Sequence, residues 1–580
     1  AGDIIFEVAR DAGVGLGSFC GGKGTCGKCK IRILSGQVSP PTEKEREHLS
    51  REDIAQGYRL ACLTKVYEAV RLEIPPEYLL ISQRLQLVGK EREVVVEPIV
   101  EAYHVTLSPA SLVDIRSDQV RILNYLAENH GLKDIDIDLS IQRQLPILLR
   151  ANEWQAKIGL RGKEVVWVGA KDRLLGLAID LGTTKIAAYL TDLETGEVLV
   201  AKGTVNHQIA YGEDVISRIT YAMENGGEIL RQTAAQDLNT LIKELCAEAG
   251  FAPNNIAEVV IVGNTAMHHL FLGLPVKQLA LAPYVPAVST PVNIKARDIG
   301  LATAPGAYVH LLANIAGFVG ADHVAMLLAT GLYDTEKTML GLDIGTNTEI
   351  SLATHGSLRS CSCASGPAFE GAHIKDGMRA TGGAIERVKI TSSSVDFQTI
   401  DDKPPIGLCG SGILDAVAQL REVGIIDYRG RLQSHPLVRR NEDGQEFVLV
   451  PKEKSGSGKD ITITQKDIGE VQLAKGAMSA GMSILLAEAN ISWEEVDEVV
   501  IAGAFGSYID VASAIKIGML PSLPAERFLQ VGNAAGVGAK LALVSKKQRQ
   551  LAEEVAHKVD YIELMNHPHY PRTFAHALRL

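Results

Sequence analysis

Four of the eight cysteines in this 580-residue sequence crowd into its first 62 positions. They are Cys20, Cys26, Cys29 and Cys62, in a C-x5-C-x2-C pattern followed by a fourth cysteine 33 positions later. Eight unevenly placed cysteines are too few to stabilise a chain of this length by disulfide bonds, which excludes a disulfide scaffold. The grouping instead predicts a site with four sulfur ligands, which holds either an iron–sulfur cluster or zinc.

The segment SFCGGKGTCGKCKIRIL resembles the cluster loop of plant-type ferredoxins, in which three close thiolates and one distant thiolate hold a [2Fe-2S] cluster. Their first gap is usually four residues, and here it is five. Zinc sites generally use two C-x2-C pairs, and only one is present, so the spacing favours iron and sulfide. Glycines suit a loop wrapped around a cluster because they accept positive φ angles. Those in this loop are Gly21, Gly22, Gly24 and Gly27.

The segments around these ligands predict a small β-grasp domain that ends near residue 75. DIIFEVARDAG has a helical apolar rhythm, whereas CKIRIL and AVRLEIP alternate like strands. Plant-type ferredoxins begin with a β-hairpin before that helix, so we expect the natural domain to extend further at its N-terminus. Basic residues flank the loop, and a solvated face explains them as well as an acidic partner does. They are Lys23, Lys28, Lys30 and Arg32.

A second chemical signal is an internal repeat. GLAIDLGTTKIAAYL from Gly176 and GLDIGTNTEISLA from Gly341 share an apolar strand, an Asp, a Gly-Thr turn and a second strand. AEVVIVGNTAMHHL from Ala257 and DEVVIAGAFGSYID from Asp497 share an acidic residue, an apolar strand and a Gly turn. One such turn is a weak signal, but two pairs in register predict two lobes built on one plan rather than two unrelated hairpins.

The repeated turns have the composition of a phosphate clamp. Their amides and hydroxyls can point at phosphate oxygens while the Asp holds hydrated Mg²⁺ or positions a water molecule. We assign the catalytic roles to Asp180 and Asp343, and Glu349 is a further candidate for water activation. The predicted phosphate contacts are Gly182, Thr183, Thr184, Lys185, Gly345, Thr346 and Asn347. The helix start in GLCGSGILDAVAQL either adds amides near the nucleotide or serves only packing. Its residues are Gly410, Ser411 and Gly412.

With these motifs, residues 173–580 resemble the acetate and sugar kinase, heat-shock-70 and actin superfamily. Asp180–Lys185 match its first phosphate motif, Asp343–Thr348 its second, and IAGAFGS at 501–507 its adenosine motif. KGAMSAGMSILLA and GNAAGVGAKLAL correspond to its two connecting helices. The resemblance implies a two-lobed, actin-like (ribonuclease-H-like) ATPase domain that binds ATP with Mg²⁺. The implied adenosine contacts are Gly503, Ala504, Phe505 and Gly506.

Composition narrows the function classes and the architecture. With 58 basic and 69 acidic residues the chain has a net charge of −11, which argues against nucleic-acid binding. No apolar run approaches the roughly 20 residues of a membrane helix, and no signal peptide is recognisable, so we expect a cytoplasmic protein. The expected fold is multidomain, α+β and α/β. Its predicted parts are a ferredoxin domain (1–75), a linker (76–105), a small middle domain (106–172) and the ATPase domain (173–580).

Along nearly its whole length the chain resembles the reductive activators of corrinoid proteins, and CASGPAFEGAHIKDGM at 363–378 is similar to that family as well. The resemblance implies an enzyme that uses ATP to transfer one electron from the cluster and reduce an inactive Co(II) corrinoid to Co(I). Its partner would be a corrinoid iron-sulfur protein or the corrinoid subunit of a methyltransferase, in anaerobic one-carbon metabolism. An upstream low-potential donor would reload the cluster, and a homodimer is compatible with the family.

Two other function classes share the phosphate motifs. A small-molecule kinase with a redox-sensing ferredoxin domain would phosphorylate a sugar or an acid and consume ATP only with that substrate. An ATP-switched scaffold would bind partners without transferring electrons. The four cysteines of the loop argue against both classes, and their number disfavours related activators that carry two [4Fe-4S] clusters.

Overall fold

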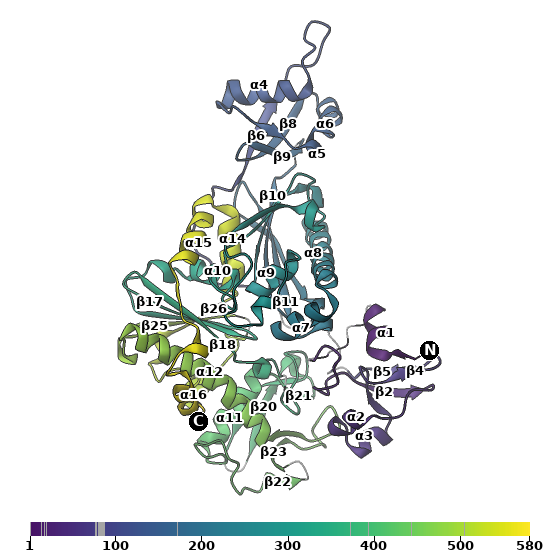
Figure 1. Ribbon diagram of the computed structural model, residues 1–580, viewed down its shortest axis with the longest axis vertical. Helices are drawn as coiled ribbons and strands as arrows, with labels where there is room; N and C mark the ends of the chain where they lie inside the picture. Colours follow the sequence, from purple (N-terminus) through teal and green to yellow (C-terminus); the bar gives the residue numbers. More distant parts are fainter. Residues whose placement is uncertain are drawn as a thin grey trace.

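The computed structural model describes residues 2–12, 14, 16, 18, 20–75, 78, 87–170, 172–371, 373–391, 394–441, 444–503 and 505–580, apart from the side chains of Asp11 and Pro367. The chain forms a small domain at one end, two lobes built on β-sheets, and an N-terminal domain beside the lobes (Figure 1). Among the described residues, every helix is too short or too polar to cross a membrane.

The N-terminal domain is a β-grasp unit with a three-stranded sheet in the order β3-β2-β5 and a short β1-β4 pair. Glu45 is fully buried and ties α2 to β3, because its carboxylate accepts from Arg59 Nε at 2.9 Å and from the Leu60 amide at 3.1 Å. This contact fixes the strand that leads directly to Cys62. The elements are β1 (Asp3–Ile4), α1 (Ile5–Asp11), β2 (Lys30–Ser35), α2 (Glu43–His48), α3 (Arg51–Ala55), β3 (Tyr58–Leu60), β4 (Lys65–Val66) and β5 (Arg71–Glu73).

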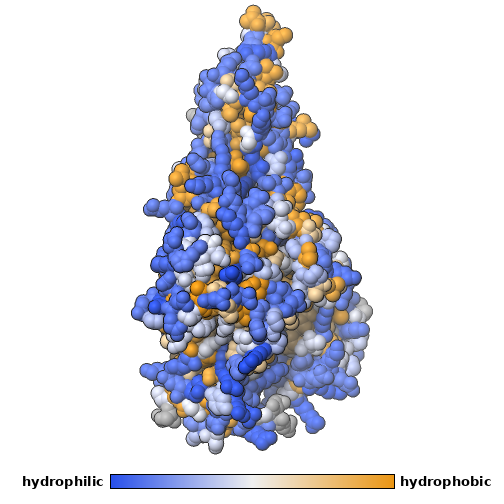
Figure 2. Space-filling view, turned by 60° about the vertical axis from the view of Figure 1, so that its left-hand side comes forward, coloured by the Kyte–Doolittle hydropathy of each residue, from blue (hydrophilic) through white to orange (hydrophobic). Residues whose placement is uncertain are grey.

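The small domain has a four-stranded sheet in the order β6-β8-β9-β7 with helices packed on it. Its first strand, β6, lies in the segment 76–105 that the sequence predicts as a linker, and it pairs with β8 along its whole length. Apolar atoms gather at the free end of this domain, where the β6–α4 loop exposes Leu112, Val113 and Ile115 (Figure 2). The elements are β6 (Val100–Thr106), α4 (Asp118–His130), β7 (Asp136–Ile137), α5 (Leu139–Gln142), α6 (Leu145–Ala151), β8 (Gln155–Arg161) and β9 (Glu164–Gly169).

The two lobes repeat one sheet topology, as the duplicated motifs predict. The first sheet has the order β12-β11-β10-β13-β15-β14 and the second the order β26-β25-β16-β17-β18-β27. In each, a three-stranded antiparallel meander continues into two parallel strands. The strands are β10 (Leu175–Leu181), β11 (Lys185–Asp192), β12 (Val198–Val205), β13 (Ile256–Val262), β14 (Val292–Lys295), β15 (Tyr308–Leu311), β16 (Met339–Ile344), β17 (Thr348–Thr354), β18 (Ser357–Cys363), β25 (Glu498–Ala502), β26 (Phe528–Gly532) and β27 (Asp560–Tyr561).

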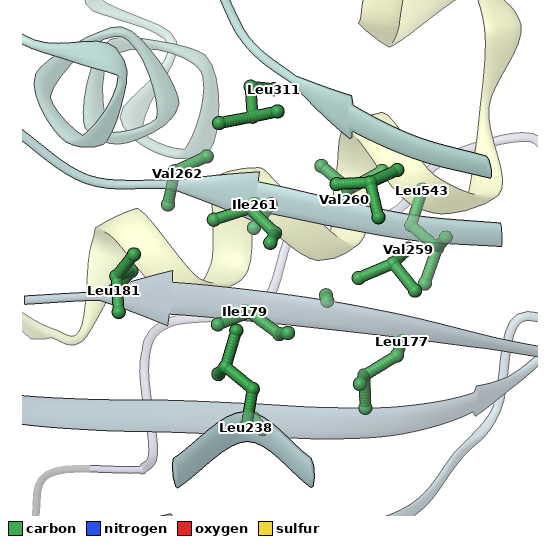
Figure 3. Close-up of a cluster of buried hydrophobic side chains, with 14 of the residues drawn as sticks. Leu177, Ile179, Leu181, Leu238, Val259, Val260, Ile261, Val262, Leu311 and Leu543 are labelled. Carbon is green, nitrogen blue, oxygen red and sulfur yellow. The ribbon is translucent and has the colours of Figure 1, made fainter. Parts of the chain in front are cut away.

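The core of the first lobe is formed by the buried central strands β10 and β13 between helices from both halves of the chain. Leu238 of α8 packs against Ile179, and Leu543 of α14 (Ala534–Val544) lies beside Val259 and Val260 (Figure 3). α14 also lies against α10 at close range, since a Cβ on Gly538 would come 2.0 Å from the Ala325 carbonyl oxygen. The first-lobe helices are α7 (Val215–Asn225), α8 (Glu228–Ala249), α9 (Thr265–Phe271) and α10 (Ala321–Thr330).

The second lobe carries two further small sheets, β20-β19-β21 and β22-β23-β24, at the side nearest the N-terminal domain (Figure 1). Their strands are β19 (Ala384–Ile390), β20 (Val395–Thr399), β21 (Gly407–Leu408), β22 (Val438–Asn441), β23 (Gly444–Val450) and β24 (Ile461–Thr464). The helices of this half are α11 (Gly410–Glu422), α12 (Gln465–Ala489), α13 (Val511–Lys516), α14 (Ala534–Val544), α15 (Lys546–Lys558) and α16 (Tyr570–Ala577).

Candidate cluster and nucleotide sites

The four cysteines of the N-terminal domain lie in two pairs. Cys20 Sγ and Cys26 Sγ are 3.4 Å apart, and Cys29 Sγ and Cys62 Sγ are 3.2 Å apart. Two thiolates on one tetrahedral metal, with bonds of about 2.3 Å, are separated by about 3.8 Å. In the described part of the chain no three His, Cys, Asp or Glu side chains converge on one point that could hold a metal ion. The cysteines therefore fit two irons with two thiolates each, rather than one zinc with four.

The loop between the first two cysteine ligands is shaped by positive φ angles, as the sequence predicts. Gly22 has a φ of 88°, and its amide donates to Ser18 Oγ at 3.0 Å. Gly24 has a φ of 74°, and a Cβ at this position would meet Leu63 Cδ2 at 2.8 Å. A hydrogen bond from the Cys26 thiol lowers the pKa of Cys20 to about 3.

Both phosphate turns open into one cavity of about 240 Å³ between the lobes. The sequence-predicted residues that line it are Asp180, Gly182, Thr183, Thr184, Lys185, Asp343, Gly345, Thr346, Asn347, Gly410, Ser411, Gly503 and Phe505. Gly412 and Gly506 do not line it. A Cβ on Gly412 would come 2.0 Å from Ile385 O, and one on Gly506 would come 2.4 Å from Ala502 O, so both positions need glycine for packing. Ala504 lies outside the described residues.

Three half-buried aspartates and the buried Glu349 crowd the cavity. Burial, together with the nearby Asp322, raises the pKa of Asp180 to about 7. The same two causes and Asp180 itself raise the pKa of Asp343 to about 8. Burial also raises the pKa of Asp322 to about 6 and that of Glu349 well above its usual value. A cation at this place would relieve the repulsion among these groups.

Polar contacts fix the two turns from outside the motifs. Asn533, which caps α14, donates to Asp180 Oδ2 at 3.1 Å, and Asn264 donates to Thr183 Oγ1 at 2.8 Å. In the second turn, Thr346 Oγ1 donates to Glu370 Oε1 at 2.5 Å. The phosphate turns are thus held in place by elements that follow other strands.

Two basic groups face the same cavity. Burial, together with the nearby Arg379, lowers the pKa of Lys185 to about 8, although the nearby Glu370 opposes this shift. Arg379, in the second lobe, is ion-paired with the buried Glu213 of the first lobe. A phosphate chain in the cavity would therefore meet a lysine from one lobe and an arginine from the other.

Flat aromatic side chains border the cavity. Phe369 and Phe505 stack with their ring centroids 4.8 Å apart and an interplanar angle of 12°, and Tyr508 lies on the same wall. Gly503 brings this segment against the second turn, because a Cβ there would stand 2.5 Å from Ile344 O. Such a wall suits a planar base.

Sequence reasoning missed several residues of this site, which come from places without a recognisable local motif. They are Glu213, Asn264, Asp322, Glu370, Arg379 and Asn533. Glu370 falls inside the segment 363–378 and Arg379 directly after it, so that segment was the available signal. Asp322 and Asn533 precede or begin helices with small residues, a pattern that by itself indicates only close packing.

Comparisons with known proteins cover nearly the whole chain. Family models match it for the 2Fe-2S iron-sulfur cluster binding domain (residues 1–67), the RACo linker region (89–174), the RACo middle region (175–335) and the C-terminal domain of RACo, the ASKHA domain (337–580).

Named relatives match over similar lengths. The corrinoid activation enzyme RamQ of Eubacterium limosum is 33% identical over 98% of this chain and 95% of its own. The [Co(II) methylated amine-specific corrinoid protein] reductase of Methanosarcina barkeri is 26% identical over 68% of this chain and 74% of its own. A solved structure titled reductive activator for corrinoid, iron-sulfur protein is 37% identical, has a TM-score of 0.75, and covers 99% of this chain and 95% of that chain.

Proposed function

Because the chain belongs to the RACo family of reductive activators of corrinoid proteins, we propose that its two phosphate turns bind one Mg-ATP and drive electron transfer from the cysteine loop. The chain is an ATP-dependent enzyme that activates a corrinoid protein by reduction. The observation that carries the proposal is that both turns of the duplicated fold line a single cavity.

Reduction of Co(II) to Co(I) is an uphill electron transfer that needs coupling to ATP. When bound, the [2Fe-2S] cluster supplies one electron at a potential near about −400 mV, as in plant-type ferredoxins. Each 59 mV of uphill transfer lowers the equilibrium constant about tenfold. ATP can shift that equilibrium only if the protein binds it preferentially in one state, so the two lobes must couple nucleotide and partner binding.

The turns supply donors and the buried carboxyls supply acceptors for catalysis. We assign Thr183, Thr184 and Thr346 to phosphate oxygens through their hydroxyls and backbone amides. Asp180 and Asp343 hold hydrated Mg²⁺ or position the attacking water. Mg²⁺ keeps several waters and takes one or two carboxylates, which suits carboxyls that do not converge on one point. A carboxyl with a pKa near 7 or 8 is also poised to accept a proton from water.

In this proposal the nucleoside binds against the aromatic wall of the cavity. The stacked Phe369 and Phe505 and the glycine turn at Gly503 border the cavity beyond the phosphate turns, where adenine has a flat apolar surface. Lys185 and Arg379 neutralise phosphate charge from opposite lobes, so closure of the lobes around ATP brings both cations to it.

The partner, in this proposal, is a corrinoid iron-sulfur protein or the corrinoid subunit of a methyltransferase, and reduction assays with both decide between them. A low-potential electron donor reloads the cysteine loop between turnovers. We place the protein in the cytoplasm because ATP and such donors act together there. The proposal includes a homodimer, and size-exclusion chromatography with light scattering measures the oligomeric state.

Asp180→Asn tests the clamp. The variant should lose ATP hydrolysis by at least about a hundredfold, because the amide neither binds Mg²⁺ nor accepts a proton, while the visible absorption of the cluster stays intact. Asp298→Asn makes the same change at an exposed position of the first lobe and should keep the parental rate. Equal hydrolysis in the Asp180 variant and the parent protein would contradict the assignment.

A further inference from the structure

The cysteine loop is seated across both lobes of the ATPase domain. On the second lobe, Lys28 Nζ donates to Ile374 O at 2.9 Å and to Gly377 O at 3.4 Å. On the first lobe, Gly21 lies so close that an added Cβ would come 2.9 Å from the Tyr211 carbonyl oxygen. Lys28 and Gly21 both stand between cysteines of the loop, so the loop itself, and not a remote part of its domain, makes these contacts.

The segment whose carbonyl groups accept from Lys28 is flanked in the chain by two residues of the cavity wall. Residues 374–377 lie between Glu370 and Arg379, which both line that cavity. The segment is held firmly from behind, because the Lys375 amide donates to Asp467 Oδ1 at 2.8 Å. Since Glu370 and Arg379 flank this segment in the chain, their displacement bears on the carbonyl groups that hold Lys28.

A second connection runs from the cysteine loop to the first phosphate turn. Gly212, which follows Tyr211, accepts from Arg218 Nε at 2.7 Å. The same buried guanidinium donates to the carbonyl oxygen of Thr183. Two relays of contacts therefore lead from the cysteine loop to the cavity. The relay through Arg218 ends at the first phosphate turn, and the relay through Glu370 ends at the second.

The charges on the relay through Glu370 and Arg379 set the direction in which nucleotide binding affects the cysteine loop. Thr346 Oγ1 donates to Glu370 Oε1 at 2.5 Å, so the hydroxyl must leave that carboxylate before it can serve a phosphate oxygen. A polyphosphate repels Glu370 and attracts Arg379 away from Glu213. Nucleotide phosphates therefore pull apart the two ends of the segment on which Lys28 is seated.

We propose that Lys28 is a positioning residue that seats the cysteine loop on the ATP clamp, and that nucleotide phosphates unseat it. The inference rests on the proposed nucleotide site and adds the route by which ATP frees the electron-transfer loop for a partner. Because coupling between two sites is reciprocal, a loop that can no longer seat must let nucleotide bind more tightly.

The test compares nucleotide affinity in cluster-loaded proteins. Lys28→Met should tighten binding of Mg-AMPPNP by about fivefold or more, the lower end of typical site-to-site coupling, in anaerobic calorimetry. Lys28→Arg should restore most of the parental affinity. Lys44→Met is the control, since Lys44 is an exposed residue of α2 in the same domain, and this variant should bind Mg-AMPPNP as the parent protein does.

Hydrogen exchange of the loop amides provides a second measurement. A second variant, outside the cysteine loop, keeps the test valid if Lys28→Met loses its cluster. Amides of residues 20–29 should exchange faster when Mg-AMPPNP is added to the parent protein, and equally fast with or without it in Lys28→Met. Lys459→Met breaks the 2.7 Å ion pair with Asp53 and unseats the same domain without touching the cysteine loop, so it should tighten nucleotide binding as well.

Parental affinity in both the Lys28→Met and the Lys459→Met proteins would overturn this inference and leave the proposed function intact. Failure of the parent protein itself to bind Mg-AMPPNP would overturn the proposed nucleotide site together with the inference. No corrinoid partner is needed, so a failed reduction assay cannot be mistaken for either result.

Discussion

Asp343→Asn should abolish ATP hydrolysis and at the same time make the protein without nucleotide more stable. Burial and two neighbouring carboxyls raise the pKa of Asp343 from 3.8 to about 8. At pH 7 the folded protein therefore keeps this carboxyl protonated, whereas the unfolded chain ionises it. The resulting penalty on the folded state has an upper limit of about 4 kcal/mol, since each pKa unit corresponds to about 1.4 kcal/mol.

The sign of the pH dependence follows from proton binding. Between pH 3.8 and about 8 the folded state binds one more proton at Asp343 than the unfolded state does, so stability falls as the pH rises through this window. Asparagine does not titrate. The advantage of the variant over the parent protein should therefore grow between pH 6 and pH 8, by at most about 2 to 3 kcal/mol.

Denaturant unfolding at pH 6 and pH 8, in the presence of a chelator and without nucleotide, measures this difference. Asp334→Asn, at an exposed position of the same half of the chain, is the control and should show no such trend. Saturating Mg-ATP should reverse the order, because it stabilises the parent protein more than the variant. A variant that is less stable than the parent protein at pH 8, or an advantage independent of pH, would refute the account of the buried carboxyls.

Two further predictions concern the cysteine pairs and the helix contact. Cys62→Ser should remove the [2Fe-2S] EPR signal of the reduced protein while the variant still binds nucleotide, and a full signal in this variant would contradict the ligand set. Gly538→Ala should destabilise the lobes by about 1 to 3 kcal/mol, since its Cβ would overlap the Ala325 carbonyl oxygen. Gly469→Ala, in α12 with no atom within 4 Å of the added Cβ, should stabilise by about 0.5 to 1 kcal/mol. Calorimetry of both glycine variants checks the contrast, and similar shifts would argue against the close packing.

The repeated lobes could be predicted from sequence because their signals are local. An apolar strand, an Asp and a Gly-Thr turn lie within a dozen residues, and the two copies at Gly176 and Gly341 occupy matching positions in two sheets that share the order of five strands. The cysteine loop could be predicted for the same reason, since the spacing of the ligands and the glycine content are properties of one short segment.

Other parts of the site depend on contacts that no local pattern encodes. Asp322 reaches the cavity from the start of α10 and shifts the pKa of two aspartates that are distant in sequence. Gly412 was expected near the nucleotide, but it lies against a carbonyl oxygen of β19 and does not line the cavity. A sequence does not distinguish a glycine that exposes its amide to an anion from one that permits close packing.

The seating of Lys28 shows the same limit. From the sequence it is one of four basic residues beside the cysteines, and a solvated face explains them as well as an acidic partner does. In the structure its ammonium donates to carbonyl groups 346 or more residues away, in the segment between Glu370 and Arg379, which line the nucleotide cavity. Such a contact is created by the docking of two domains, which no short segment specifies.

In the proposed function, ATP drives electrons from the cysteine loop to cobalt. The most direct measurement mixes the reduced, cluster-loaded protein with a Co(II) corrinoid protein under anaerobic conditions and follows the Co(I) absorbance with and without Mg-ATP. The account predicts that Co(I) accumulates only with Mg-ATP, and not with the Asp180→Asn variant. ATP turnover without cobalt reduction, for corrinoid iron-sulfur proteins and methyltransferase subunits alike, would contradict it and favour a kinase or a scaffold.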